Sequence, residues 1–361
     1  MKVSIDILSG AGRKTAAAVL VTYQASHESR EIRFLLDAGG ALEVGEDKGW
    51  TQPKNLDAIL ISHDHQDHMG GLLDVDGNVP VYATQDVQKL LPTHLNLQTL
   101  PVGGMTLIEG IEVTTGSAGH SFGGVWLHLN IGEGVYYSGD FSLESTLYPF
   151  TMPPKAKIAL LDASYGLYDN SLEKGKQSLL SFLKEEKSLV MPVPQTGRAL
   201  EIACWLTSLD FHDWTLGEDC LSAETALASS MEGICADARP VLECLKGRQF
   251  DPNAKVILCG DPDGVSGVAA DLLFQPETYL PVYTGHLPDH ARQAISEDKA
   301  HFVRWNVHPR KQDLKRLISH LGCDTCVPLF HGMKDLQEWQ EALGSSITSQ
   351  TYIEKTYEIN P

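Results

Sequence analysis

One stretch of this sequence constrains the fold and the chemistry more than any other: LDAILISHDHQDHMGGL, at Leu56–Leu72. Its first seven residues are largely apolar and predict a buried strand that ends near Ser62. The next six residues contain three histidines and two aspartates, and two glycines follow soon after. Histidine and aspartate are common protein ligands of transition metals. The stretch therefore predicts a metal site on a loop that a buried strand holds in place.

The spacing of these side chains indicates two metal positions. In an extended loop, residues two apart point to the same side, so His63 and His65 can bind one ion together. Asp67 and His68 come next and can turn toward a second ion about 3.5–4 Å away, the usual separation in two-metal sites. The two glycines let the backbone turn tightly into a helix. Surface histidines are the alternative interpretation, and the preceding apolar run argues against it.

Two metal ions need more donors than this loop supplies. Three further polar residues follow predicted strands: Asp37 in FLLDAGG, His120 in SAGHSFGG and Asp140 in YYSGDFS. Any one of them alone would be interpreted as a turn residue or a hydrogen-bonded polar group. Their order around the histidine-rich motif favours a role in metal binding.

The expected secondary structure changes in character near residue 157. The first 150 residues are β-rich, with apolar or alternating runs separated by glycines and charged turns. From Lys157 onward strands and helices alternate, which is typical of an α/β domain. The strands expected in this part are 157–164, 188–194, 254–260, 280–285, 301–307 and 325–332. The helices expected are 171–186, 197–209 and those that begin near Val265, Pro309 and Met333.

The net charge of −19 over 361 residues argues against a general nucleic-acid surface. One stretch, Arg304–Arg316, is nevertheless basic, with five arginines and lysines against the single acid Asp313. An acidic body with one basic stretch suits a locally anionic substrate. A solvated helix face explains the same charges.

The seven cysteines, Cys244 among them, are expected to be buried, reduced thiols of a cytoplasmic protein. The C-x-x-C in GCDTC lacks a second pair to complete a zinc ribbon and is expected in the core. No apolar run is long enough to cross a bilayer, so we expect no membrane partner.

The ordered set of motifs resembles the metallo-β-lactamase superfamily. Its hallmarks are a strand-end aspartate, H-x-H-x-D-H, a lone histidine, a lone aspartate and a final histidine. The resemblance implies a first metal bound by His63, His65 and His120, a second bound by Asp67 and His68, Asp140 as a bridge, and Asp37 as a residue that orients the ligands. Imidazole and carboxylate donors without a thiolate suit two Zn²⁺ ions, with Mn²⁺ or iron as alternatives.

The second half resembles the β-CASP nucleases, the family of RNase J and the cleavage-and-polyadenylation endonuclease. The similar segments are LLDASYG (160–166), PVPQTGRALEI (192–202), VILCGDPDGVSGVAADLL (256–273) and PVYTGH (281–286). WNVHPRKQDLKRLI and CVPLFHG are similar to two later motifs. By this resemblance Asp162 is an active-site acid, His308 faces the scissile phosphate, and His331 completes the second metal site.

The resemblance implies an α/β protein with an αββα metallo-β-lactamase sandwich formed by residues 1–164 and 300–361. An α/β β-CASP domain is expected as an insertion at 165–299, and the active cleft is expected where the two domains meet. The implied activity is hydrolysis of phosphodiester bonds in single-stranded nucleic acid by a hydroxide that two metals activate. The residues expected to take part are Asp67, Asp162 and His308 in the reaction, and Arg198, Arg304, Arg310 and Lys311 in substrate binding.

RNA is the favoured substrate, because relatives that act on RNA tend to carry histidine where His331 stands. A DNA nuclease of the same family is one alternative. A hydrolase of thioesters, lactones or β-lactams and an inactive binding subunit are two others; the β-CASP signatures argue against the former and the full ligand set against the latter. The sequence leaves open whether the chain acts alone, as a homo-oligomer or in a protein complex.

Overall fold

The computed structural model describes residues 1–42, 46–227, 234–235, 248–285 and 287–357. It divides the chain into two compact units. Unit 1 comprises Met1–Leu143, Phe150–Asp169 and His308–Pro361, and unit 2 comprises Glu144–Pro149 and Asn170–Val307. Two residues named above, Cys244 and His286, lie outside the described residues.

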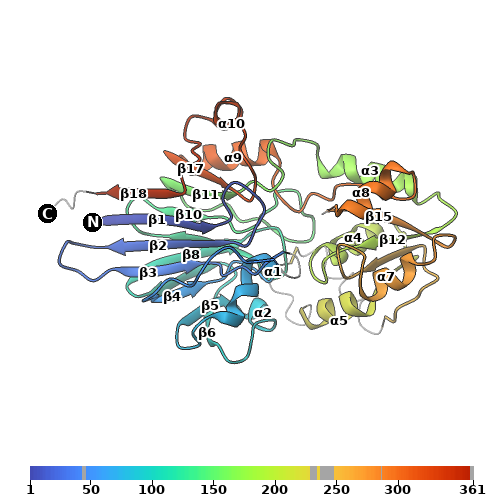
Figure 1. The fold of residues 1–361 in the computed structure, drawn as a ribbon, viewed down its shortest axis with the longest axis horizontal. Helices are drawn as coiled ribbons and strands as arrows, with labels where there is room; N and C mark the ends of the chain where they lie inside the picture. The colour runs from blue at the N-terminus through green and yellow to red at the C-terminus, as the bar shows by residue number, and fades with distance from the viewer. Residues whose placement is uncertain (43–45, 228–233, 236–247, 286, 358–361) are drawn as a thin grey trace. The chain divides into compact units, whose positions relative to one another are not determined.

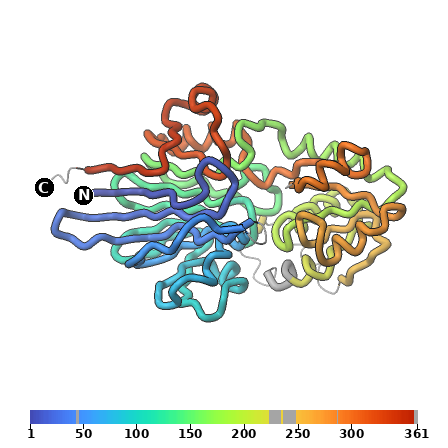
Figure 2. Tube along the Cα trace, in the orientation of Figure 1, coloured from blue at the N-terminus to red at the C-terminus, as the bar shows by residue number. Residues whose placement is uncertain are grey.

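The first sheet of unit 1 has seven strands in the described chain. In spatial order they are β18 (Tyr352–Thr356), β1 (Lys2–Ser9), β2 (Ala18–Gln24), β3 (Ile32–Leu36), β4 (Ala58–Leu60), β5 (Pro80–Thr84) and β6 (Asn96–Leu100). Strands β18 to β3 are antiparallel, whereas β3 to β6 run parallel. Because β18 pairs with β1, the first and last described strands lie side by side (Figures 1 and 2).

The second sheet of unit 1 has six strands, counted over the described residues. They are β17 (Thr325–Leu329), β11 (Ile158–Asp162), β10 (Val135–Tyr137), β9 (Val125–Leu129), β8 (Ile111–Ser117) and β7 (Gly104–Ile108). The first three strands are parallel, and the pairs from β10 to β7 are antiparallel. Strands β8, β10, β11 and β17 therefore all end at the same edge of this sheet.

The two sheets of unit 1 pack face to face around one apolar core. Val3, Ile5 and Ile7 of β1 alternate along their strand and point into this core. Leu127 and Leu160 reach the same core from the second sheet. This alternation is what a strand with one buried face requires.

Helices cover the outer face of each sheet. On the second sheet α9 (Lys311–Leu321) and α10 (Leu336–Leu343) share an apolar cluster with β9 to β11 (Figure 1). On the first sheet α1 (Gln66–Met69), the 3₁₀ helix η1 (Gly70–Asp74) and α2 (Gln85–Gln88) lie beside β4 and β5, and Leu72 and Val87 join the cluster there. The predicted αββα sandwich is thus confirmed.

Unit 2 is built on a parallel sheet of five strands in its described part. In order these are β13 (Trp214–Leu216), β14 (Val256–Cys259), β12 (Ser188–Pro192), β15 (Tyr279–Tyr283) and β16 (His301–Phe302). The helices in the described part of this unit are α3 (Leu172–Phe182), α4 (Arg198–Ser208), α5 (Glu218–Leu227), α7 (Gly267–Leu273) and α8 (Asp289–Ser296). A parallel sheet with alternating helices agrees with the α/β pattern of the sequence.

Two local expectations differ from the structure. The strand expected over 301–307 is short, because the chain beyond Phe302 continues as a coil that donates from Val303 N–H to Tyr283 O and from Trp305 N–H to Thr284 O. The metal motif is not one extended loop, because α1 begins inside it at Gln66. His65 O accepts the backbone N–H of His68 at 2.9 Å and so closes the first helical turn.

The cysteine expectation is confirmed for the pair in GCDTC, since Cys323 and Cys326 are both buried. Among the helices of the described chain, none combines the length and the apolar character that a bilayer span requires.

We expect Leu160→Ala to reduce the free energy of unfolding by about 2–5 kcal/mol, because it opens a cavity in the core between the two sheets. Leu160 is fully buried and pairs with strands on both sides. Leu107→Ala is the matched control, since Leu107 is 65% exposed on β7, and we expect a change within about 0.5 kcal/mol. Urea unfolding of both variants measures the difference, and equal stabilities would contradict this description of the core.

Candidate metal centre

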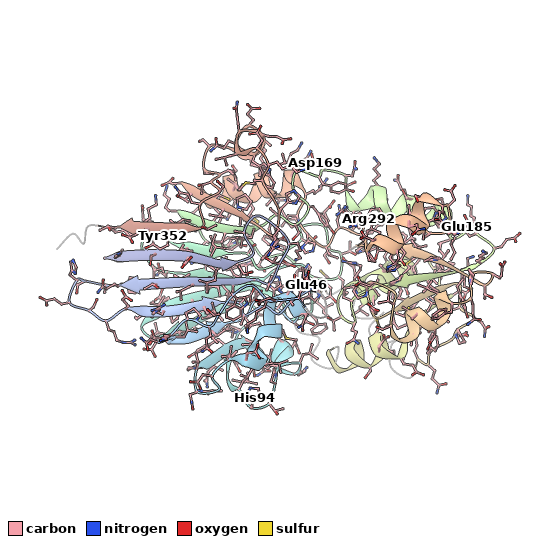
Figure 3. The ribbon with its side chains drawn as sticks, viewed as in Figure 1. Glu46, His94, Asp169, Glu185, Arg292 and Tyr352 are labelled. Carbon is pink, nitrogen blue, oxygen red and sulfur yellow. The ribbon has the colours of Figure 1, made fainter. Side chains whose placement is uncertain are left out.

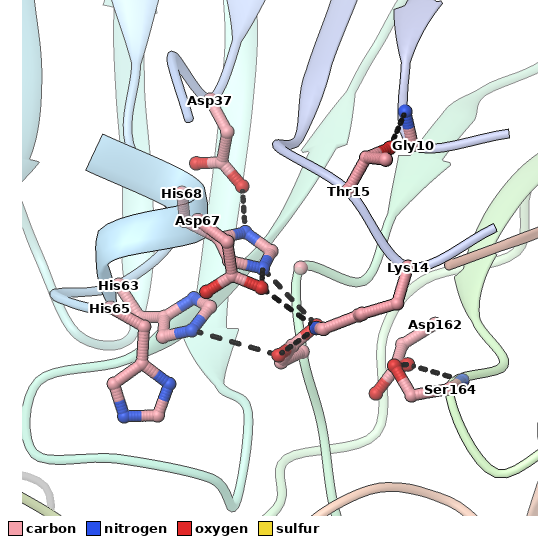
Figure 4. A network of polar contacts seen from close by, with 12 residues as sticks. Gly10, Lys14, Thr15, Asp37, His63, His65, Asp67, His68, Asp162 and Ser164 are labelled. Carbon is pink, nitrogen blue, oxygen red and sulfur yellow. Dashed lines mark hydrogen bonds and ion pairs between the residues drawn. The ribbon is translucent and has the colours of Figure 1, made fainter. Parts of the chain in front are cut away.

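The candidate site forms where strands of both sheets of unit 1 end. Asp37 follows β3 and His63 follows β4, and these neighbouring strands are parallel. His120 follows β8 and Asp140 follows β10, whose carboxyl ends share one edge of the other sheet. Because the sheets pack face to face, side chains far apart in the sequence converge at this edge (Figure 4).

The first group of donors contains three imidazoles and one carboxylate. His63, His65, His120 and Asp140 offer ligand atoms that all lie within 4.8 Å of one another. Nδ1 of His65 and Nε2 of His120 are 3.0 Å apart, and Oδ2 of Asp140 lies 3.9 Å from Nε2 of His63. This donor set is one that Zn²⁺ accepts in tetrahedral geometry.

A second group consists of Asp67, His68 and Asp140. Nε2 of His68 lies 3.3 Å from Oδ1 of Asp140 and 3.8 Å from Oδ2 of Asp67. Asp140 therefore belongs to both groups, one oxygen facing each. The helical turn of α1, rather than an extended loop, brings Asp67 and His68 to this position.

A third group joins Asp140 to Asp162 and His308. Nδ1 of His308 lies 2.8 Å from Oδ2 of Asp162 and 3.6 Å from Oδ2 of Asp140. Asp162 is fully buried at the end of β11, where Ser164 donates to it from its backbone N–H and from its hydroxyl. His308 is thereby held in one orientation beside the imidazole of His120, with ring centroids 5.1 Å apart.

Asp37 orients the residues of the site without belonging to any of the three donor groups. Its carboxylate accepts hydrogen bonds from the backbone N–H and the hydroxyl of Ser62, each at 2.7 Å, and from the hydroxyl of Tyr137 at 2.6 Å. It also lies 2.6 Å from Nδ1 of His68 (Figure 4). A carboxylate on Nδ1 selects the tautomer that leaves Nε2 free to act as a ligand.

Burial lowers the pKa of His63 and of His65, in the case of His63 well below the ordinary value. Neighbouring imidazoles lower the pKa of His63 further, because two positive rings repel one another. Both side chains are therefore neutral at physiological pH. A neutral imidazole is the form that binds a metal ion.

The carboxylates are held in the anionic form. Burial by itself raises the pKa of Asp67, but the Lys14 ammonium and His68 more than offset it and lower the pKa to about 2. Against the same effect of burial, Lys14, His68 and His308 hold the pKa of Asp140 well below its usual range. Burial also disfavours the charged form of His68, yet Asp140 and Asp67 raise its pKa well above the ordinary value.

Three buried polar atoms of the first two donor groups indicate whether these groups fit metal ions. Nε2 of His63, Nε2 of His68 and Oδ1 of Asp140 are buried and have no hydrogen-bond partner among the described residues. Buried polar atoms are nearly always hydrogen-bonded, so a cluster of exceptions requires a reason. A divalent cation in the first group would satisfy Nε2 of His63, and a cation in the second group would satisfy Nε2 of His68 and Oδ1 of Asp140.

The other predicted residues of unit 1 make different contacts. The ring of His331 lies 5.7 Å from that of Trp339, and His331 is in none of the donor groups of the described chain. Nε of Arg310 bonds Asp313 at 3.2 Å, and Nζ of Lys311 lies 3.6 Å from Asp169, which Figure 3 labels. The two basic residues of unit 1 that were expected to bind substrate thus have acidic neighbours. Arg198 and Arg304 belong to unit 2.

The sequence analysis missed Lys14. This residue belongs to the loop after β1, and its ammonium lies 2.8 Å from Oδ2 of Asp67. The available signal was its position, since it follows a strand and lies near glycines, as Asp37, His120 and Asp140 do. A lysine is not among the usual metal ligands, so the pattern of donors does not include it.

Comparison with known families agrees with this geometry. Residues 33–170 match the family described as the Beta-lactamase superfamily domain. The matched range contains every donor of the first two groups. This part of the chain, residues 33–170, thus resembles the metallo-β-lactamase superfamily.

Curated relatives match part of this chain. Transcription termination factor FttA of Methanocaldococcus jannaschii is 29% identical over 225 residues, which are 48% of this chain and 35% of the relative. A ribonuclease of Thermus thermophilus is 27% identical over 230 residues, 50% of this chain and 53% of the relative. The chain thus spans between a third and about half of the length of these relatives. They confirm the resemblance to β-CASP-type members of the superfamily.

A solved structure shares the fold over most of the chain. A protein of unknown function from Enterococcus faecalis V583 superposes with a TM-score of 0.59 at 14% identity. The superposition covers 92% of this chain and 94% of the other.

We expect Asp37→Asn to weaken zinc binding by about 10- to 100-fold, because the amide no longer orients the hydroxyl of Ser62, which lies 3.0 Å from Nδ1 of His63 in the first group. Asp57→Asn is the matched control. Asp57 also accepts a backbone N–H, that of Arg33, but lies before the opposite end of β4. Zinc affinity is measured by competition with a chromogenic chelator. Equal affinities for the two folded variants would contradict the role assigned to Asp37.

Proposed function

We propose that this protein is a metal-dependent nuclease that hydrolyses phosphodiester bonds, with single-stranded RNA as the favoured substrate. The observation that carries the proposal is the third donor group, in which a histidine held by a buried aspartate stands beside the metal ligands. Simple metal binding does not need such a pair. Such a pair suits the hydrolysis of a phosphodiester, because charge on the phosphoryl oxygens and the leaving oxygen must be stabilised.

Asp162 and His308 divide this task. The carboxylate of Asp162 accepts from Nδ1 of His308 at 2.8 Å and keeps the imidazole in place. Nε2 of His308 then interacts with the substrate. It either donates a hydrogen bond to a phosphoryl oxygen or exchanges a proton with the leaving oxygen. Ser164 keeps Asp162 oriented through its two hydrogen bonds.

The residues proposed as metal ligands are those of the first group, His63, His65, His120 and Asp140. The resemblance to the superfamily implies Asp67, His68 and His331 as further ligands for a second ion. A divalent ion bound there supplies a Lewis acid that polarises the phosphoryl group and lowers the pKa of a water molecule toward neutrality. Zn²⁺ suits the donors, with Mn²⁺ or iron as alternatives. Two zinc ions are the family-based expectation. The first group takes one ion by itself, whereas the second group already holds the Lys14 ammonium.

RNA is preferred over DNA for two reasons. The Thermus thermophilus relative is a ribonuclease, and histidine at position 331 is the residue expected in relatives that act on RNA. We propose that unit 2 is the β-CASP domain and that Arg198 and Arg304 bind substrate phosphates, as do Arg310 and Lys311 of unit 1. Phosphate contacts of this kind are independent of sequence and weaken with salt.

We expect His308→Ala to reduce RNA cleavage by about 10²–10³-fold, because it removes a donor that stabilises charge in the transition state. Asp67→Ala should also lose activity, since it removes a carboxylate of the second donor group that pairs with Lys14. The assay uses zinc-loaded protein with RNA and DNA of one sequence, single-stranded and labelled at either end. The product ladder also reports whether cleavage is internal or proceeds from one end.

His212→Ala is the control for this assay. His212 is exposed in unit 2, where it pairs with Asp210, and its loss should leave cleavage unchanged. Cleavage of DNA alone would overturn the preference for RNA. No cleavage of either strand by metal-loaded protein would overturn the nuclease function and leave the small-ester hydrolase and the inactive binding subunit as alternatives.

Removal of the metal should abolish cleavage and also destabilise the fold. Zinc at a hundred times its dissociation constant adds about 2.7 kcal/mol to the free energy of unfolding, because it binds the folded state. Denaturant unfolding with zinc and with a chelator measures this difference. His63→Ala should show little of the zinc-dependent gain, and a full gain in that variant would place the ion elsewhere.

A further inference from the structure

Lys14 places a positive charge inside the second donor group. Its ammonium lies 2.8 Å from Oδ2 of Asp67 and 3.5 Å from Oδ2 of Asp140. These two carboxylates are the anionic donors of the group that they form with His68. Figure 4 shows Lys14 extending from its loop toward Asp67.

The loop that carries Lys14 is closed against the end of β17. Nζ of Lys14 lies 4.8 Å from the ring centroid of Phe330, a cation–π distance. The backbone N–H of Phe330 donates to Gly10 O at 2.6 Å, and Gly10 N–H donates to the hydroxyl of Thr15 at 3.2 Å (Figure 4). A Cβ at Gly10, whose φ is +99°, would lie 2.8 Å from the Phe330 ring. The loop therefore depends on glycine there to bring Lys14 to the carboxylates.

The fourth donor that the sequence predicts for the second position is not beside it. His331 lies against Trp339 instead, with ring centroids 5.7 Å apart. In the described chain the second group therefore has three donors, Asp67, His68 and Asp140. The first group has four without any lysine, namely His63, His65, His120 and Asp140.

The second donor group cannot hold both the Lys14 ammonium and a metal ion at these distances. A zinc ion bound by Asp67 would lie about 2.0–2.2 Å from its oxygen, and the ammonium already lies 2.8 Å from Oδ2 of that residue. Two cations that share one carboxylate repel each other, and the partly buried setting weakens screening. The ammonium and a second metal ion are thus mutually exclusive.

We propose that the ammonium of Lys14 takes the place of the second metal ion, so that the protein binds one metal ion, at His63, His65, His120 and Asp140. This inference rests on the metal centre of the proposed function but not on its nuclease activity. An ammonium has three N–H donors. Asp67 and Asp140 accept two of them, and the third is directed to an oxygen of the anionic substrate. Lys14 thereby supplies beside the single ion the charge that a second ion would supply.

The test measures metal stoichiometry. Full-length protein is loaded with excess zinc, passed through gel filtration in zinc-free buffer and analysed by inductively coupled plasma mass spectrometry. Wild type should retain about one zinc per chain. Lys14→Met removes the charge at similar length and should retain about two, whereas Lys14→Arg, which keeps the charge, should retain about one. Arg13→Met is the matched control, because the neighbouring Arg13 is an exposed cation, and it should behave as wild type.

Each other outcome has a defined meaning. Two zinc ions in wild type would overturn the inference, whatever the variants do. One zinc in both wild type and Lys14→Met would also overturn it, because the charge of Lys14 would then not be what excludes the second ion. No zinc in wild type would overturn the metal centre of the proposed function itself. Circular dichroism checks that the variants are folded, and Lys14→Gln serves as a second neutral variant if the methionine variant is not.

Discussion

One buried carboxylate connects the two sheets of unit 1 to the metal-binding segment. Asp37 follows β3 in the first sheet, accepts from Ser62 at the end of β4, and accepts from Tyr137 of β10 in the second sheet. Its remaining interaction is with His68. Asp37 is fully buried with a φ of 55°, a conformation that aspartate tolerates better than most residues. The site is therefore fixed by the same contacts that set the two sheets against each other.

The parts of this arrangement that the sequence predicts are those with a local signal. An apolar run followed by histidines is such a signal, and so are single polar residues at the ends of β3, β8 and β10. The two-sheet sandwich could be expected from these patterns and from the resemblance to a known superfamily. The convergence of Asp37, His120 and Asp140 follows from strand direction, because parallel strands end at one edge.

What the sequence did not reveal depends on contacts between distant segments. The helical turn at Gln66 within the metal motif has no strong sequence signal, since histidine and aspartate are poor helix formers. The position of His331 depends on packing against Trp339 of α10. Arg310 likewise pairs with Asp313, and Lys311 lies near Asp169. These acidic neighbours reduce the net positive charge of the basic stretch 304–316. Lys14 becomes relevant only once the folding of β1 against β17 brings its loop to the carboxylates.

The edge strands β17 and β18 of unit 1 are synthesised after the strands with which they pair. β1 pairs with residues 352–356, and β11 pairs with residues 325–329, so both sheets remain unfinished until the end of the chain has been made. The described strands of unit 2 lie within residues 188–302, so all of them are synthesised before β17 and β18 of unit 1. Contacts of such long sequence separation form slowly. Most candidate ligands are therefore synthesised before the strands that complete the sheets around them, and His308 is synthesised after them. The candidate site thus depends on strands that are made later than most of its own residues.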